Sequence, residues 1–232
     1  MTKLALSGLM AEREAFLDVM SSLSDAEWEM PSAEVGKSMR DIVAHIGSSH
    51  RLVIEPDFAP GGIDPVVFRR SWDIDAVVDE FDRFTEQSAA VFGRMQAINR
   101  PRPMGDFGSH PTSFLPDLYL FDMYGHLRAD VVPPLGREEP PRDEQRLRPT
   151  VDWMFEALPQ MCPAEVAIEI TLDGPGGGTW TIGPDAPAVA KVHGTDHDFV
   201  LWGTGRKPWR DYVDLDGDES LAGPALDAIR II

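Results

Sequence analysis

The chain has 232 residues, of which 43% are hydrophobic, so it is long enough for one large domain or two small ones. Its 39 acidic and 21 basic side chains give a formal net charge of -18, which disfavours binding to a phosphate backbone or to anionic lipid. We therefore expect no nucleic-acid partner, no membrane partner, and a monomer or weak dimer in solution. The single cysteine, Cys162, excludes an internal disulfide. With no signal-peptide pattern, it indicates a cytoplasmic protein.

Apolar residues recur at helical spacing through the first 132 residues and predict four main helices. We expect them at residues 3–22, 38–55, 73–98 and 112–132, with a short capped helix at 24–29. The stretches 56–71 and 99–111 are rich in proline and glycine and predict loops. This pattern is typical of a four-helix bundle.

The pattern changes after residue 133. A proline-rich, charged stretch to about residue 149 predicts a linker, and residues 150–161 predict one short helix. Apolar and polar residues then alternate, which predicts three strands near 164–172, 178–183 and 188–194. Two helices follow, at 195–205 and near the C-terminus. The fold class is therefore α+β, and we expect a bundle at 1–135, a linker with a short helix at 136–162, and a small α+β domain at 163–232.

Asp122 and His126 lie four residues apart on the fourth predicted helix, among apolar neighbours. At this spacing both side chains share one helix face, and burying them is costly unless something pairs them. They form either an ordinary carboxylate–histidine pair or, with His45, a set of two nitrogens and one oxygen that suits a zinc ion with an open fourth position. His50 is an alternative ligand, whereas His110 is expected to be exposed in a loop.

Several segments together resemble a known family. SMRDIVAHI, DLYLFDMYGHLRAD, KVHGTDHDFVLWGTGR and GDESLAGPALDAIRII occur in the order seen in the mycothiol-dependent maleylpyruvate isomerase family, and LSDAEWEMPS is also similar. The resemblance covers nearly the whole chain. It implies a DinB-like four-helix bundle followed by a small sterol-carrier-like domain.

The resemblance also implies a divalent metal, usually zinc, held by His45, Asp122 and His126. It implies mycothiol, the low-molecular-weight thiol of actinobacteria, as co-substrate. Two positions depart from the family: Asp122 stands where the family usually has Glu, and Lys37 where it usually has Trp. The first affects the geometry or choice of the metal, and the second affects the substrate pocket.

The family activity is isomerisation of maleylpyruvate, in which a thiolate formed at the metal adds to the electrophilic substrate. Related DinB-like proteins instead act as mycothiol S-transferases. Cys162 has no neighbouring histidine, so the thiol must come from outside the chain. We expect the pocket to lie between the bundle and the C-terminal domain.

An anionic substrate requires a cation, and a guanidinium suits a carboxylate. The candidates are Arg40, Arg128, Arg206 and Arg230. Arg206, in the family-like segment WGTGR, is the predicted catalytic arginine. The alternative is a non-catalytic small-molecule binding module, with an apolar cavity lined by Trp180, Phe199 and Trp202.

Overall fold

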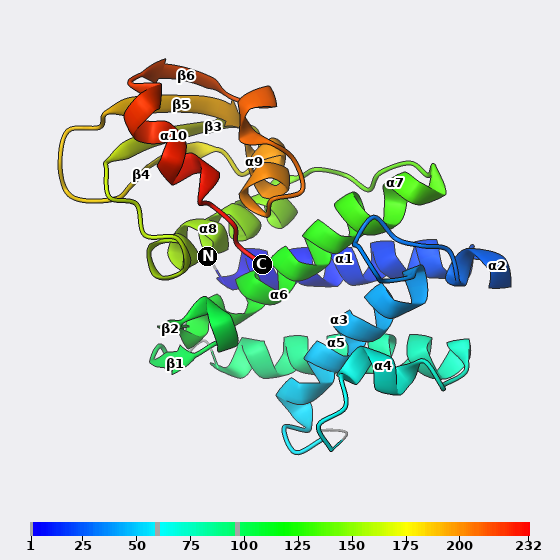
Figure 1. The fold of residues 1–232 in the computed structure, drawn as a ribbon. Coiled ribbons are helices and arrows are strands. Elements are labelled where there is room, and N and C mark those ends of the chain that lie inside the picture. Colours follow the sequence, from blue (N-terminus) through cyan, green and yellow to red (C-terminus); the bar gives the residue numbers. More distant parts are fainter. Residues whose placement is uncertain (1, 59–60, 96–97) are drawn as a thin grey trace.

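The structure is a computed structural model that describes residues 2–58, 61–95 and 98–232. The four predicted main helices are present as α1 (Thr2–Ser21), α3 (Met39–Ile54), α5 (Ile74–Met95) and α6 (Leu115–Gly125), and they pack as a bundle (Figure 1). The predicted helical stretch at residues 96–97 lies outside the described residues. None of the helices that the structure describes is long and apolar enough to cross a bilayer.

Capping boxes fix where two of the N-terminal helices begin. Ser24 and Glu27 form one at the start of α2 (Asp25–Trp28), as predicted. At α3 the Ser38 hydroxyl accepts the backbone N–H of Asp41, and the Asp41 carboxylate accepts the backbone N–H of Ser38, both at 3.2 Å. This reciprocal bonding defines the first turn of α3 and so places His45 one turn further along.

Both predicted loops of the N-terminal half contain regular structure, so those predictions were wrong in detail. Residues 56–71 include α4 (Pro65–Arg69), which Asp64 caps by accepting two backbone N–H groups. Residues 99–111 include a hairpin of β1 (Pro101–Pro103) and β2 (Ser109–Pro111). The backbone N–H at the first position of a helix has no acceptor within that helix, so proline is tolerated there. A proline-rich stretch can therefore still begin a helix.

The fourth helix does not end before Pro133 as predicted. After α6 the chain forms a π-helical turn (His126–Val131) and continues into α7 (Val132–Leu135), which contains Pro133 and Pro134. These prolines occupy the first turn of α7, the part of a helix in which proline is best tolerated. The wider π turn coincides with the second predicted histidine ligand, and such turns often occur at functional sites.

Helix α8 (Glu144–Met161) is longer than the predicted short helix, because it begins inside the predicted linker. Asp143 caps it, and Pro149 lies within it. Proline 149 cannot donate to the carbonyl of Gln145, and that carbonyl points at α1, where a Cβ at Gly8 would collide with it. The glycine thus allows α8 to lie directly against α1.

The C-terminal region is built on a four-stranded sheet with the order β4-β3-β5-β6. The strands are β3 (Ile168–Asp173), β4 (Gly178–Ile182), β5 (Ala190–Thr195) and β6 (Asp214–Gly217). The β3–β4 hairpin is antiparallel as predicted, and β3 and β5 are parallel. Strand β6 was not predicted, because its sequence, DLDG, has no apolar alternation.

Helices α8, α9 (Asp196–Gly203) and α10 (Glu219–Asp227) share one apolar core with this sheet. Alternate residues of β3, from Ile168 to Leu172, supply the buried face of the sheet. The structure therefore confirms the α+β class, with a helical N-terminal region followed by a small sheet region (Figure 1). The division at residues 135 and 163 stays a prediction, since α8 contacts both regions.

Candidate metal centre

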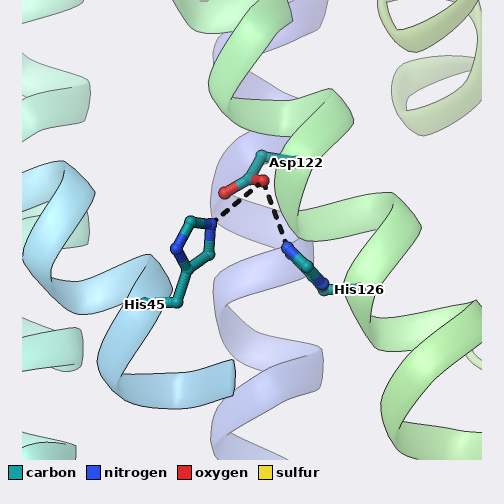
Figure 2. Close-up of side chains that lie close together, drawn as sticks. All are labelled: His45, Asp122 and His126. Atoms are coloured by element: carbon teal, nitrogen blue, oxygen red, sulfur yellow. Dashed lines mark ion pairs between the residues drawn. The ribbon is translucent and has the colours of Figure 1, made fainter. Parts of the chain in front are cut away.

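The structure brings His45, Asp122 and His126 together (Figure 2). His45 comes from α3, Asp122 from α6, and His126 begins the π-helical turn. Asp122 Oδ1 lies 3.5 Å from His45 Nε2 and 3.3 Å from His126 Nε2. The two imidazole rings meet edge to face, with centroids 5.1 Å apart.

The spacing of these donor atoms suits a shared cation better than direct hydrogen bonding. Both distances exceed the usual length of about 2.9 Å for an N–H···O bond. Zinc bonds of about 2.0–2.2 Å at tetrahedral angles separate neighbouring donor atoms by roughly 3.3 Å. Two nitrogens and one carboxylate oxygen at this spacing therefore fit a divalent metal and leave room for another ligand.

A second set of polar groups holds His126 from the side away from Asp122. Its Nδ1 lies 2.8 Å from Asp130 Oδ2, and Arg206 donates to both oxygens of Asp130 at 3.1 and 2.6 Å. Glu34 Oε2 lies 3.5 Å from the same Nδ1. A histidine ligand usually donates its other ring nitrogen to a carboxylate in this way, which fixes the tautomer and the ring orientation. Here the arrangement directs Nε2 toward Asp122.

The charges of these groups depend on one another. Burial acts to raise the pKa of Asp122, but the two histidines hold it well below its ordinary value, so the carboxylate is ionised. Burial lowers the pKa of His126, whereas Asp122 and Asp130 raise it, with a net result of about 9. Without a metal, the positive charge of His126 therefore balances the carboxylates of Asp122 and Asp130.

His45 lines a cavity of about 400 Å3, on the side of the centre away from Asp130 and Arg206. The lining residues all fall between Val35 and Arg70, and they come from the loop before α3, from α3 itself and from α4. Two cations border the cavity, and each is already paired: Lys37 with Glu34 at 2.6 Å, and Arg70 with Asp41 at 2.8 Å. The prediction of a pocket between the bundle and the C-terminal region was therefore wrong for this cavity, because its walls belong to the bundle alone.

The other predicted histidines lie elsewhere. His50 is fully buried, its Nδ1 bonds the Ser88 hydroxyl at 2.6 Å, and burial lowers its pKa to about 3. His110 is also fully buried, which contradicts the expected exposure. It bonds Glu156 and the carbonyl of Phe107, because the loop around it folds into the β1–β2 hairpin against α8.

The four candidate arginines have different surroundings. Arg40 pairs with Glu29, and Arg128 pairs with Glu12 in a fully buried ion pair. Arg230 is exposed and lies against Gly205. Arg206 alone reaches the candidate metal centre, through Asp130.

The residues suggested for an apolar binding module do not gather around one cavity. Phe199 and Trp202 are buried in the core of the C-terminal region. Trp180 stacks on Phe155 and lines a smaller cavity of about 260 Å3 together with Cys162. The Cys162 thiol accepts the backbone N–H of Arg230 at 3.3 Å and is not among the residues around His45.

Sequence reasoning missed three residues of the site. Asp130 continues the four-residue spacing of Asp122 and His126, so its position on the helix was a usable signal. Glu34 and Arg70 come from a turn and from the end of a short helix, where no periodic pattern exists to place a side chain.

Comparison with known proteins agrees with this architecture. The family model named MDMPI C-terminal domain matches residues 146–224, a stretch that begins inside α8. The crystal structure of the mycothiol-dependent maleylpyruvate isomerase covers 94% of each chain with a TM-score of 0.64 at 14% identity. A histidine-to-alanine variant of that enzyme gives 0.63 over the same share, also at 14% identity. No curated protein matches the chain significantly. The motif-based resemblance is thus confirmed: residues 146–224 match the MDMPI C-terminal domain family, and the chain has the fold of the mycothiol-dependent maleylpyruvate isomerase.

Proposed function

We propose that this chain is a metal-dependent enzyme that uses a low-molecular-weight thiol, with mycothiol as the first candidate, to isomerise a small electrophile. One observation carries the proposal. Two histidines and one carboxylate converge at the spacing of metal ligands, and one of those histidines borders a cavity. The fold and the C-terminal family match of the mycothiol-dependent maleylpyruvate isomerase support the choice of thiol and reaction.

His45, Asp122 and His126 would hold the metal. A divalent cation with an open position supplies one kind of chemistry here, because it stabilises a thiolate over a thiol. The protein keeps Asp122 ionised and holds His126 by its Nδ1, so both donors face the same point. His45 places that point beside the cavity, where a thiol and an electrophile could meet.

The reaction balances without any group beyond thiol and substrate. The thiolate sulfur adds to one carbon of a cis double bond conjugated to a carbonyl, and the electron pair moves onto the carbonyl oxygen as an enolate. The former double bond is now single and rotates. The enolate then collapses, re-forms the double bond as trans and expels the thiolate. If the adduct is protonated and released instead, the same first step gives a thiol transferase.

Arg206 supports this chemistry as a positioning residue. Its guanidinium donates to both oxygens of Asp130, and Asp130 in turn bonds His126. Arg206 would therefore act on the substrate only through Asp130 and His126. Arg70, at the cavity, is the better candidate for a direct contact with a carboxylate.

The test uses purified full-length protein, loaded with zinc and checked for stoichiometric metal. It is assayed against maleylpyruvate and a panel of unsaturated electrophiles, with and without mycothiol. We expect turnover that requires both the metal and the thiol, and a rate that rises with pH until the thiol is ionised. Turnover indifferent to added thiol would contradict the proposal. Absence of turnover together with tight binding of an apolar ligand would favour the binding-module alternative.

A further inference from the structure

The cavity beside His45 has an apolar rim that is open to solvent. Val35 is 98% exposed, and Leu52 and Val67 are 42% and 49% exposed. All three line the same cavity, although they come from the loop before α3, from α3 and from α4. Single exposed aliphatic side chains are ordinary, but a group of them around one cavity marks a surface that binds something apolar.

The most exposed of these residues is held in place by a tight turn. Val35 lies between Glu34 and Gly36, and the backbone N–H of Lys37 donates to the carbonyl of Glu34 at 3.2 Å. Gly36 has a φ of +84°, which a turn of this kind requires at its third position. The Ser32 hydroxyl bonds the Lys37 carbonyl at 2.9 Å and ties the turn down. Turn tips usually carry polar residues, so a valine fixed at this tip needs a reason.

The charges around the cavity leave little capacity for anions. Lys37 is paired with Glu34, and two nitrogens of Arg70 bond the two oxygens of Asp41 at 3.0 and 2.8 Å. Within the part of the chain that the structure describes, Arg70 Nη1 has no bonded partner, so Arg70 can still meet one carboxylate. Asp64, the acidic lining residue, accepts the N–H groups of Val66 and Val67. A second carboxylate would have to take the open position of the metal, which the thiol needs in the proposed function.

We propose that the substrate of this cavity is an amphiphilic electrophile: an unsaturated carbonyl compound with an aliphatic or aromatic body and a single carboxylate. Its apolar body lies against Val35, Leu52 and Val67, its carboxylate faces Arg70, and its reactive carbon lies toward His45. The cavity, at about 400 Å3, falls within the usual size range for small-molecule sites. This inference rests on the proposed function and differs from it in excluding compact dicarboxylates as the preferred substrate.

The experiment uses inert ligands, so that binding is measured apart from catalysis. Butanoate, hexanoate and octanoate are titrated calorimetrically into the zinc-loaded full-length protein, with succinate as the compact dicarboxylate. We expect affinity to rise about two- to fourfold for each methylene that the rim covers. Succinate should bind at least about tenfold more weakly than octanoate. Equal affinity along the series, or tighter binding of succinate, would overturn the proposal.

Three variants locate the binding. Leu52→Ser and Val67→Ser should flatten the dependence on chain length, while Leu221→Ser, at an equally exposed leucine on α10, should leave it unchanged. If Leu221→Ser flattens it as well, the ligands bind nonspecifically and the inference fails. Sedimentation velocity checks whether the rim instead joins two copies of the chain. A dimer that Leu52→Ser dissociates, with no chain-length dependence, would also overturn the proposal.

The outcomes separate this inference from the proposed function. Saturated acids need neither thiol nor turnover, so an intact chain-length dependence without any thiol-dependent turnover would refute the proposed function alone. Thiol-dependent turnover of maleylpyruvate with a flat series would refute the amphiphilic substrate alone.

Discussion

The two histidines of the candidate metal centre face opposite kinds of surroundings. His126 is 9% exposed and bonds Asp130, which Arg206 holds in turn. His45 is 32% exposed and borders the cavity. One side of the centre is therefore fixed by paired and mostly buried charges, and the other side is open.

This difference divides the work of the site between two parts of the molecule. The fixed side joins the bundle to the C-terminal region, because Arg206 follows α9 whereas His126 and Asp130 lie in the π-helical turn. The open side belongs to the bundle alone and ends in the apolar rim. We infer that the fixed side sets the geometry of the donors and that the open side sets what can approach them.

The largest expected effect comes from removing a ligand on either side. His126→Ala and His45→Ala should each reduce zinc content to less than about a tenth of wild type and abolish turnover, while the far-ultraviolet circular dichroism stays that of a folded chain. Their stabilities should differ. His126→Ala leaves a buried carboxylate without one partner and should cost about 1–3 kcal/mol in the free energy of unfolding.

His45→Ala removes a side chain that is one-third exposed, so it should cost less than about 1 kcal/mol when both metal-free proteins are compared in urea. Equal loss of unfolding free energy in the two variants would show that His45 and His126 are equally important for stability, and would contradict the division into a fixed and an open side. Full zinc content in either variant would show that the replaced histidine is not a ligand.

The second prediction tests the fixed side without touching a ligand. Asp130→Asn and Arg206→Ala should each weaken zinc binding about 10- to 100-fold, because His126 loses the group that orients it. Arg206→Lys keeps the charge but not the two parallel bonds, and it should recover only part of the loss. The readout is zinc affinity by competition with a chelator. If Arg206 instead contacts the substrate, its removal would raise KM and leave zinc affinity unchanged.

The third prediction concerns pH. In the metal-free protein His126 has a pKa of about 9, so below that pH the metal must displace a proton from Nε2. Apparent zinc affinity should therefore rise about tenfold per pH unit from pH 6.5 toward 9 and then level off. Asp130→Asn removes a negative charge that raises the pKa of His126. The apparent zinc affinity of this variant should therefore level off at a lower pH than that of the wild type. A flat profile over this range would contradict the charge assigned to His126.

The same raised pKa affects stability with the opposite sign. Because the folded metal-free chain binds this proton more tightly than an unfolded chain, with an ordinary pKa of 6.5, the contribution is fully present below pH 6.5. It is lost as the pH rises through about 9. Metal-free protein should therefore lose stability over the range in which it gains zinc affinity, as urea unfolding at several pH values would measure.

The fixed side was more predictable from sequence than the open side. Asp122 and His126 share a helix face by spacing alone, and Asp130 extends that spacing, although it was not identified. The start of α3 at Ser38 was also predicted, with Asp41 in the first turn, and this placed His45 near the correct turn.

The open side depends on chain segments that have no period. Val35 lies in a turn, and Arg70 caps the end of α4 inside a stretch that predicted only a loop. Their positions follow from how the turn and α4 pack beside α3, which is tertiary information. His110 shows the same limitation, because only the packing of the β1–β2 hairpin against α8 explains its burial. Residue spacing within one helix could predict neither the open side of the site nor the burial of His110.

The smallest effect is expected at Asp122, where this chain departs from the family that it resembles. Its Oδ1 already lies 3.5 and 3.3 Å from the two Nε2 atoms, close to the donor spacing that zinc requires. Asp122→Glu adds a methylene, so the longer side chain must bend back to present its oxygen at the same point. We expect zinc affinity to fall about three- to tenfold, with little change in stability, because Asp122 is partly exposed. Asp122→Asn is the matched control, since it keeps the length and removes the charge, and it should lose more affinity than Asp122→Glu. Tighter zinc binding by Asp122→Glu would contradict this expectation. It would mean that the distance between α3 and α6 suits the longer glutamate, and that the shorter Asp122 lowers the affinity for zinc.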